Sequence, residues 1–166
     1  MFATKNSGFD SLVRAYSAEL YRYAYWLCRD RFVAEDLVQE TFARAWSARS
    51  SLREERAAKS WLYTILRHEN ARLHERKRLD IDDGQDLDAL EDQRMRSVSA
   101  DLEMRQALYA LPESYREPLL LQVIGGFSCE EIAEMMKLTT GAVMTRLTRA
   151  RQVLRREPAT GQEAAK

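Results

Sequence analysis

Apolar residues recur at intervals of three and four along most of the chain, the spacing that places them on one face of an α-helix. This pattern predicts helices over residues 8–27, 32–48, about 59–78, 101–111, 115–124, 129–136 and about 140–156. Only 6 Gly and 3 Pro interrupt the 166 residues, which favours helices with few tight turns. The sequence therefore predicts an all-α protein.

The residues on these apolar stripes are expected to point inward. Tyr16, Tyr23 and Trp46 could instead stack on nucleic-acid bases, but aromatic residues at helical spacing are far more often core residues. We therefore assign them to the core. The other stripe positions of the second, third and fifth helices are Val33, Leu37, Thr41, Ala45, Trp61, Leu62, Ile65, Leu66, Leu73, Leu119, Leu120 and Val123.

An acidic segment divides the chain. Residues 80–97 contain a glycine and show little apolar periodicity, which is typical of a linker. We therefore predict two small helical domains, over residues 1–79 and 98–158, joined by an acidic flexible linker. A disordered tail is expected over 159–166.

The charges are segregated although the chain has no net charge, with 26 basic and 26 acidic residues. Residues 44–78 hold ten Lys and Arg against four Asp and Glu, residues 80–103 hold two against nine, and residues 137–156 hold six against none. A single basic helix is usually only a solvated surface. Two basic blocks in a neutral chain favour two separate contacts with a polyanion such as nucleic acid.

The second half has the layout of a helix-turn-helix. Ser128 and Glu131 can form a capping box at the start of a short helix, and Phe127 and Ile132 occupy the positions of a hydrophobic staple. A three-residue turn, 137–139, then leads into a longer basic helix that is capped by one of two consecutive threonines. The C-terminal domain is therefore predicted to be a helix-turn-helix domain.

The last helix separates into two faces when each residue advances by about 100°. The buried stripe is predicted to consist of Val143, Leu147, Ala150 and Leu154. The opposite face carries Thr145, Thr148, Arg149 and Gln152, with Met144, Arg151 and Arg155 beside it. Hydroxyl, amide and guanidinium groups are those that reach base edges and phosphates. An ordinary surface helix mixes acids with bases, so the absence of acids here favours DNA binding over a solvated face.

Other chemistries find little support. His68 and Glu69 begin like a zinc-protease motif, but Arg72 stands where a second His is required. Cys28 and Cys129 are expected to be ordinary, partly buried thiols. The sequence contains no recognisable Gly-rich phosphate loop or nucleophile–base pair, so we expect neither an enzyme nor a bound cofactor or metal. No apolar run could span a bilayer and the N-terminus lacks the apolar region of a signal peptide, so we expect a cytoplasmic protein.

Several stretches have the sequence of known motifs. Residues 127–136 and 140–151, together with 111–121 upstream, resemble region 4 of the extracytoplasmic-function (ECF) sigma factors of the sigma-70 family. Residues 34–46, which read Ala-Glu-Asp-Leu-Val-Gln-Glu-Thr-Phe-Ala-Arg-Ala-Trp, resemble region 2.2, and 61–65 resemble the start of the promoter-reading part of region 2. The resemblance follows the family's order along the chain and places the acidic segment at its interdomain linker.

The resemblance implies an alternative sigma factor that directs RNA polymerase to specific promoters and is regulated by an anti-sigma factor. The first domain would bind the clamp of the polymerase β′ subunit through Asp36, Gln39, Glu40 and Phe42. It would read the −10 element with Arg53, Arg56, Lys59, Trp61, Asn70, Arg72 and Arg76. The second domain would touch the β flap and read the −35 element with Thr140, Gly141, Met144, Thr145, Thr148, Arg149 and Gln152.

The spacing on the second helix agrees with a binding surface, because Asp36, Gln39, Glu40 and Ala43 fall on one face. The alternative hypothesis is a dimeric regulator whose helix-turn-helix binds an operator without polymerase. That hypothesis leaves the acidic face of the second helix unexplained.

The sequence departs from the family at Met144, where family members often have Lys or Arg.

The sequence also departs from the family's pattern at Glu69, because an acidic residue is unexpected in a helix that faces DNA.

Overall fold

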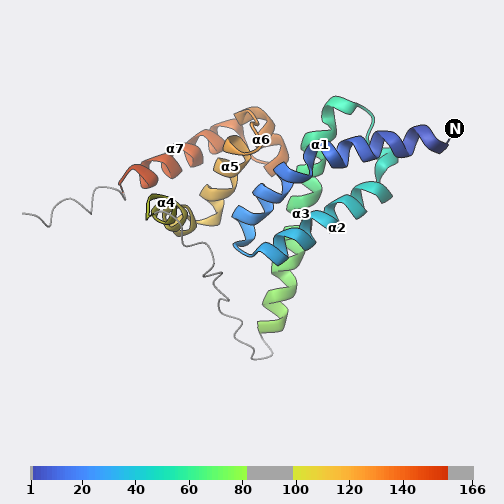
Figure 1. Ribbon diagram of the computed structural model, residues 1–166. Coiled ribbons are helices and arrows are strands. Elements are labelled where there is room, and N and C mark those ends of the chain that lie inside the picture. The colour runs from blue at the N-terminus through green and yellow to red at the C-terminus, as the bar shows by residue number, and fades with distance from the viewer. Residues whose placement is uncertain (1, 82–98, 157–166) are drawn as a thin grey trace, which may run out of the picture. The chain divides into compact units, whose positions relative to one another are not determined.

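The computed structural model describes residues 2–81 and 99–156, and the secondary structure of this part of the chain is entirely helical (Figure 1). The chain divides into two compact units, residues 1–91 and 92–166. The all-α fold with two helical domains is confirmed. Within the described ranges, no helix combines the length and the apolar character needed to cross a bilayer.

The first unit is built from three long helices. They are α1 (Phe2–Cys28), α2 (Arg31–Ser47) and α3 (Ala58–Ile81), and two short 3-10 turns, η1 (Arg49–Ser51) and η2 (Glu55–Ala57), connect the last two. Helix α3 continues through Asp80 and Ile81, which the sequence assigned to the linker. The remainder of the predicted linker and the predicted tail lie outside the described residues.

A two-residue turn reverses the chain between α1 and α2. Arg29 adopts a left-handed backbone conformation with φ 62°, and its N–H donates to the carbonyl oxygen of Tyr25 at 2.9 Å. The Asp30 carboxylate then accepts hydrogen bonds from the backbone N–H groups of Phe32 (2.8 Å) and Val33 (3.1 Å). The first turn of a helix leaves these N–H groups without a partner in the helix, so Asp30 is the N-cap of α2.

The core of the first unit lies where α2 packs against both α1 and α3. Tyr23 of α1 and Tyr63 of α3 are fully buried, with ring centroids 5.0 Å apart. At the other end of α1, Phe9 lies edge-on to Phe42 and Trp46 of α2, with centroid distances of 6.4 and 5.0 Å. The assignment of Tyr23 and Trp46 to the core is therefore confirmed, although Trp46 is only half-buried.

The second unit contains α4 (Ser99–Ala110), α5 (Glu113–Val123), α6 (Cys129–Met136) and α7 (Thr140–Arg156). Helix α7 packs against α5 and α6, so the apolar stripe of α7 closes this core. Val123 was predicted to point inward, and that prediction was wrong, because 70% of this residue is exposed. Val123 stands one helical turn after buried Leu119 and is the last residue of α5.

The entry to α6 follows the predicted capping box. The Ser128 N–H donates to the Glu131 carboxylate at 2.7 Å, and the Glu131 N–H donates to the Ser128 hydroxyl at 3.2 Å. Phe127 and Ile132, the two staple residues, are buried. A methyl group at Gly125 would lie 2.6 Å from the Phe127 ring, so only glycine lets this ring close over the turn.

The turn between α6 and α7 also has the predicted length. Lys137 ends α6 in the left-handed conformation, with φ 55°, and the N–H of Leu138 donates to the carbonyl oxygen of Ala133 at 2.9 Å. The Thr139 hydroxyl accepts from the N–H of Ala142 at 3.1 Å, so Thr139 caps α7. The helix-turn-helix layout is therefore present in the structure.

Candidate nucleic-acid and protein-binding surfaces

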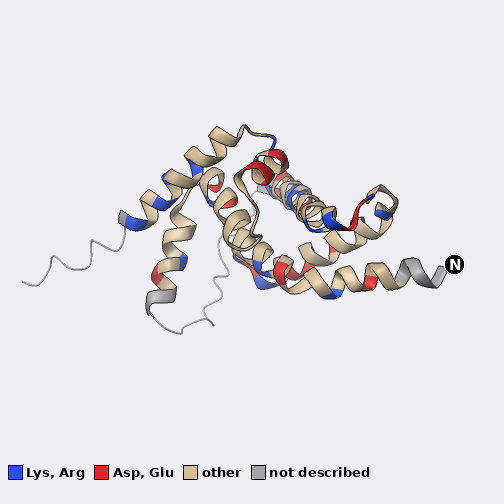
Figure 2. Cartoon of the chain, turned by 90° about the horizontal axis from the view of Figure 1, so that it is seen from above, with Lys and Arg blue, Asp and Glu red and all other residues tan. Residues whose placement is uncertain are grey.

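Helix α7 has the two faces that its sequence predicts. Val143, Leu147 and Ala150 are buried and Leu154 is half-buried. The opposite side is exposed along its length, at Met144, Thr145, Thr148, Arg149, Arg151, Gln152 and Arg155. Figure 2 shows basic but no acidic colouring along α7. This surface can therefore approach a polyanion without an acid of its own helix opposing it.

The two threonines of this face already use their hydroxyl protons. Thr145 donates to the carbonyl oxygen of Gly141, and Thr148 donates to that of Met144, each at 2.9 Å. Each side chain therefore presents an acceptor oxygen and a methyl group to the outside. Such a pair suits the amino groups of adenine or cytosine and the methyl group of thymine. Arg149, at one edge of this face, supplies the complementary donors.

The start of α7 is open. Gly141 is exposed, and no atom lies within 4 Å of the position that a Cβ would take there. Thr140 is half-buried, whereas the Met144 side chain is 56% exposed and points away from the core. The first backbone N–H groups of a helix favour an anion, so a phosphate could approach this end closely.

A second polar face lies on α2. Asp36, Gln39, Glu40 and Ala43 are all exposed, as their spacing predicts. Phe42 does not belong to this face, because it is half-buried against Phe9 of α1. It lies about 120° around the helix from Asp36, and its contact with a partner stays a prediction.

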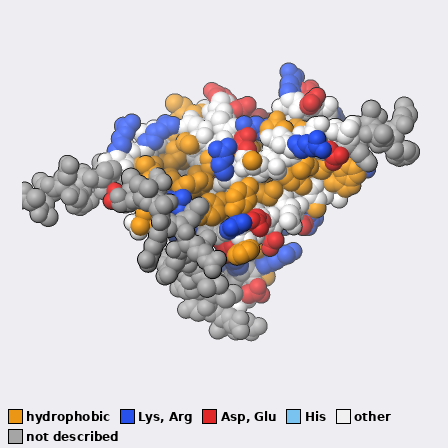
Figure 3. Space-filling view, viewed as in Figure 1, with side chains coloured by type: hydrophobic (Ala, Val, Ile, Leu, Met, Phe, Trp, Pro, Cys, Tyr) orange, Lys and Arg blue, Asp and Glu red, His pale blue; other side chains and the backbone are white. Residues whose placement is uncertain are grey.

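Sequence reasoning missed one residue of the α2 face. Phe32 stands one helical turn before Asp36 and is 75% exposed. Apolar side chains reach the surface among charged ones in the view of Figure 3, and single exposed apolar residues are normal. Phe32 differs because it continues a polar face of the same helix. Its spacing of four from Asp36 and seven from Gln39 was the signal that could have found it.

Six of the seven residues predicted to read the −10 element fall into three groups by their exposure. Arg53, Arg56 and Arg76 are exposed, and Arg56 pairs with Glu54 at 2.6 Å. Trp61 and Lys59 are half-buried. Asn70 does not fit a DNA-facing role, because it is 6% exposed. Its carboxamide oxygen accepts from the Cys28 thiol at 3.6 Å, so Asn70 ties α3 to the end of α1.

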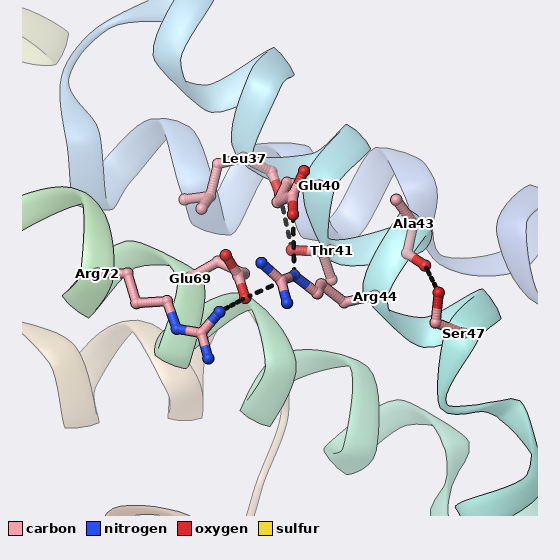
Figure 4. A network of polar contacts seen from close by, with 8 residues as sticks. All are labelled: Leu37, Glu40, Thr41, Ala43, Arg44, Ser47, Glu69 and Arg72. Atoms are coloured by element: carbon pink, nitrogen blue, oxygen red, sulfur yellow. Dashed lines mark hydrogen bonds and ion pairs between the residues drawn. The ribbon is translucent and has the colours of Figure 1, made fainter.

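The remaining residue of that set, Arg72, belongs to a network between α2 and α3 (Figure 4). Glu69 Oε1 lies 3.4 Å from Arg44 Nε on α2 and 3.3 Å from Arg72 Nη1 on α3. Arg44 Nε also lies 2.9 Å from Glu40 Oε1. The Glu69 side chain is only 11% exposed, so it faces α2 and not the outside. This placement explains why an acid stands at position 69 of a helix in which basic residues predominate.

A further, partly buried contact joins α1 to α3. The Tyr63 hydroxyl donates to Glu19 Oε1 at 2.8 Å, and Lys59 Nζ lies 2.9 Å from the same oxygen. Burial raises the pKa of Tyr63 well above its usual range, and the hydrogen bond to Glu19 raises it further. The Tyr63 hydroxyl therefore keeps its proton, and donates this hydrogen bond, at pH values where a free tyrosine ionises. Lys59 is held by this contact against the helices.

Cys28 and Cys129 are half-buried, which confirms the burial predicted for both. Among the described residues, no group of three or more His, Cys, Asp or Glu side chains could hold a metal ion.

Comparisons with known proteins cover both units. Residues 12–79 match the family model of Sigma-70 region 2, and residues 101–154 match that of Sigma-70, region 4. RNA polymerase sigma factor SigV of Bacillus subtilis (strain 168) is 30% identical over 138 residues, which cover 82% of this chain and 82% of that protein. ECF RNA polymerase sigma factor EcfG of Rhodopseudomonas palustris (strain TIE-1) is 34% identical over 124 residues, 73% of this chain and 68% of that protein.

The fold is also similar to that of a solved sigma factor. The structure of the sigma factor RpoE from Bartonella quintana, in complex with the anti-sigma factor NepR, superimposes with a TM-score of 0.76 at 29% sequence identity. The match covers 93% of this chain and 98% of that one.

Proposed function

Because this chain belongs to the extracytoplasmic-function group of the sigma-70 family, we propose that its two units divide the work of promoter recognition between them. As an alternative sigma factor, the protein binds core RNA polymerase and promoter DNA and directs transcription initiation. We propose which residues of each unit bind the polymerase and the promoter. The first unit binds the polymerase and reads the −10 element, and the second reads the −35 element.

The observation that carries the proposal is the exposed face of α7. It combines two hydroxyl acceptors, at Thr145 and Thr148, with the donors of Arg149 and Gln152, and it contains no acid. A helix of this kind, second in a helix-turn-helix, enters the major groove with its outer face against the base edges. In this proposal, Arg149 donates both hydrogen bonds of a bidentate contact to guanine.

The face of α2 supports binding to core polymerase. Asp36 and Glu40 present carboxylates that attract basic side chains of a partner, and exposed Phe32 extends the same face with an apolar ring. Aromatic anchors that become buried contribute much of the binding energy of protein interfaces. In this proposal the partner is the clamp of the polymerase β′ subunit.

The segment from η1 to the end of α3 supports reading of the −10 element. Exposed Arg53, Arg56 and Arg76 supply contacts to phosphates, and half-buried Trp61 offers an aromatic surface for an unpaired base. Arg72 is exposed enough to reach DNA while Glu69 holds its guanidinium. We leave Asn70 out of the reading set because of its burial.

Regulation and location follow the family. The similar structure of RpoE is that of a complex with an anti-sigma factor, and an anti-sigma factor is accordingly the regulator that we propose for this chain. The protein would act in the cytoplasm beside the polymerase, without catalytic chemistry of its own.

Run-off transcription tests the proposal. Core RNA polymerase is assayed on fragmented host DNA with and without the full chain, and the transcripts are sequenced from their 5′ ends. We expect a small set of start sites that depend on the chain and share sequence elements near −35 and −10. Transcripts that are identical with and without the chain would contradict the proposal.

A further inference from the structure

Two polar contacts join α5 to α7 at the proposed DNA-reading helix. Arg149 Nη1 donates to the Tyr115 hydroxyl at 3.3 Å, and Arg151 Nη2 donates to the Gln122 side-chain oxygen. Tyr115 and Gln122 are seven residues apart and share one face of α5. The two arginines are about 200° apart around α7, one on each side of its buried stripe. Helix α5 therefore holds one arginine on each flank of α7.

We propose that Tyr115 is a positioning residue for the reading of one −35 base pair, because its hydroxyl fixes the guanidinium of Arg149 before DNA is bound. This inference rests on the proposed function, in which Arg149 contacts a base. Tyr115 itself is not assigned a contact with a base.

The geometry of the guanidinium makes this role suitable for a tyrosine. Arginine has five N–H donors in a planar fork and no acceptor. Tyr115 occupies one N–H of Nη1, which leaves the edge formed by Nε and Nη2 for the two acceptors of guanine. The hydroxyl oxygen accepts this hydrogen bond and does not compete with the base as a carboxylate would. Because the Tyr115 ring is half-buried, its hydroxyl is held in place by the fold.

Positioning raises specificity by removing an entropic cost of binding. A free arginine side chain must lose most of its rotamer freedom when it forms a bidentate contact. When Tyr115 has already restricted the side chain of Arg149, less freedom remains to be lost on DNA binding. This gain appears only at the base pair that Arg149 reads, because other positions do not use its guanidinium.

Gln122 provides a matched control on the same helix. Its partner, Arg151, lies on the other flank of α7. There we expect it to contact a phosphate of the DNA backbone and not a base edge. Loss of the Gln122 contact should therefore affect all promoter sequences alike. The two contacts differ in their expected readout although they are similar in type and join the same two helices.

The test uses core polymerase reconstituted with the full chain on a promoter in which every −35 position is varied. Tyr115→Phe removes the hydroxyl and keeps the ring. We expect it to lower the preference for the best base at one position by about three- to tenfold, the effect of losing one pre-ordered side chain. Arg149→Ala should abolish preference at the same position, and the double variant should lose no more than Arg149→Ala alone.

Gln122→Ala is the control for Tyr115→Phe. Gln122→Ala should lower transcription from all promoter variants by a similar factor and leave the preferences intact. If Tyr115→Phe keeps the wild-type preference while Arg149→Ala loses it, the positioning role is wrong and the proposed function stands. If Arg149→Ala itself keeps every preference, the proposed reading by α7 fails, and the role of Tyr115 fails with it.

Discussion

Arg44 of α2 and Glu69 of α3 form an ion pair, with Nε 3.4 Å from Oε1, between the two helices that we assign to polymerase and to DNA. Each partner is shared, because Arg44 also pairs with Glu40 and Glu69 also pairs with Arg72. The charges therefore alternate across the helix contact (Figure 4). Glu69 is the least exposed of the four side chains, and it is the centre of the network.

Glu69→Gln should destabilise the first unit by about 1 kcal/mol, because two guanidinium groups lose a partly buried carboxylate. Denaturant unfolding of the full chain would measure this difference. It should shrink in concentrated salt, where exposed arginines are screened. Glu40→Gln is the control. Both side chains of the Glu40–Arg44 pair are about half exposed, so this pair should contribute less to stability. Equal effects of the two substitutions would show that the lower exposure of Glu69 has no consequence.

Phe32→Ala should weaken binding to core polymerase without destabilising the protein, because the ring is 75% exposed and extends the face of Asp36. An aromatic anchor at an interface costs about 1–3 kcal/mol when it is truncated. Fluorescence anisotropy of the labelled chain against core enzyme would measure the change.

Leu79→Ala provides the control for Phe32, because Leu79 is equally exposed, at 75%, on a different helix. It should leave the affinity for core polymerase unchanged. Equal losses for both variants would indicate a general effect of surface apolarity and would remove Phe32 from the interface.

Tyr63→Phe should lower the free energy of unfolding by about 1 kcal/mol, because Glu19 loses a buried hydrogen-bond donor. The raised pKa also predicts a pH dependence. The hydroxyl keeps its proton in the folded state above its ordinary pKa of 10.0, whereas the unfolded chain ionises there. Stability from this group is therefore present below pH 10 and falls as the pH rises above it. Unfolding curves between pH 8 and pH 11 should show a smaller fall for Tyr63→Phe than for the wild type.

Much of the fold could be predicted from the sequence because its signals are local. The cap at Asp30, the capping box of Ser128 and Glu131 and the apolar stripe of α7 each depend on residues within one or two helical turns. The same stripe also indicated correctly that Arg149 is exposed. Local patterns of this kind identify elements and their faces.

Contacts between helices could not be predicted in the same way. Asn70 and Glu69 lie in a segment whose basic residues are typical of DNA binding. Their partners, Cys28 and Arg44, come from α1 and α2. Periodicity also placed Val123 inward, although 70% of this residue is exposed at the end of α5. What a helix face contacts depends on where its neighbours end, and the spacing of its own residues does not contain that information.

Gly141→Ala should separate folding from DNA binding. A Cβ at this position meets no atom within 4 Å, and alanine favours a helix over glycine by about 0.5–1 kcal/mol, so the second unit should become slightly more stable. If a phosphate approaches the start of α7, the added methyl group should nevertheless weaken promoter binding. Thermal unfolding and filter binding of the reconstituted holoenzyme would measure the two effects. Unchanged promoter affinity would mean that this end of α7 stays away from the DNA backbone.

The most direct test of the account compares Arg149→Ala with Arg155→Ala in promoter binding by the reconstituted holoenzyme, over a range of salt concentrations and with each −35 base varied. Arg149→Ala should remove the preference at one −35 position, by about 1–3 kcal/mol of discrimination. Arg155→Ala should weaken all sequences alike and lower the salt slope by about one, as expected for a single phosphate contact. If Arg149→Ala leaves every −35 preference and the yield of open complex unchanged, the face of α7 assigned to DNA is wrong.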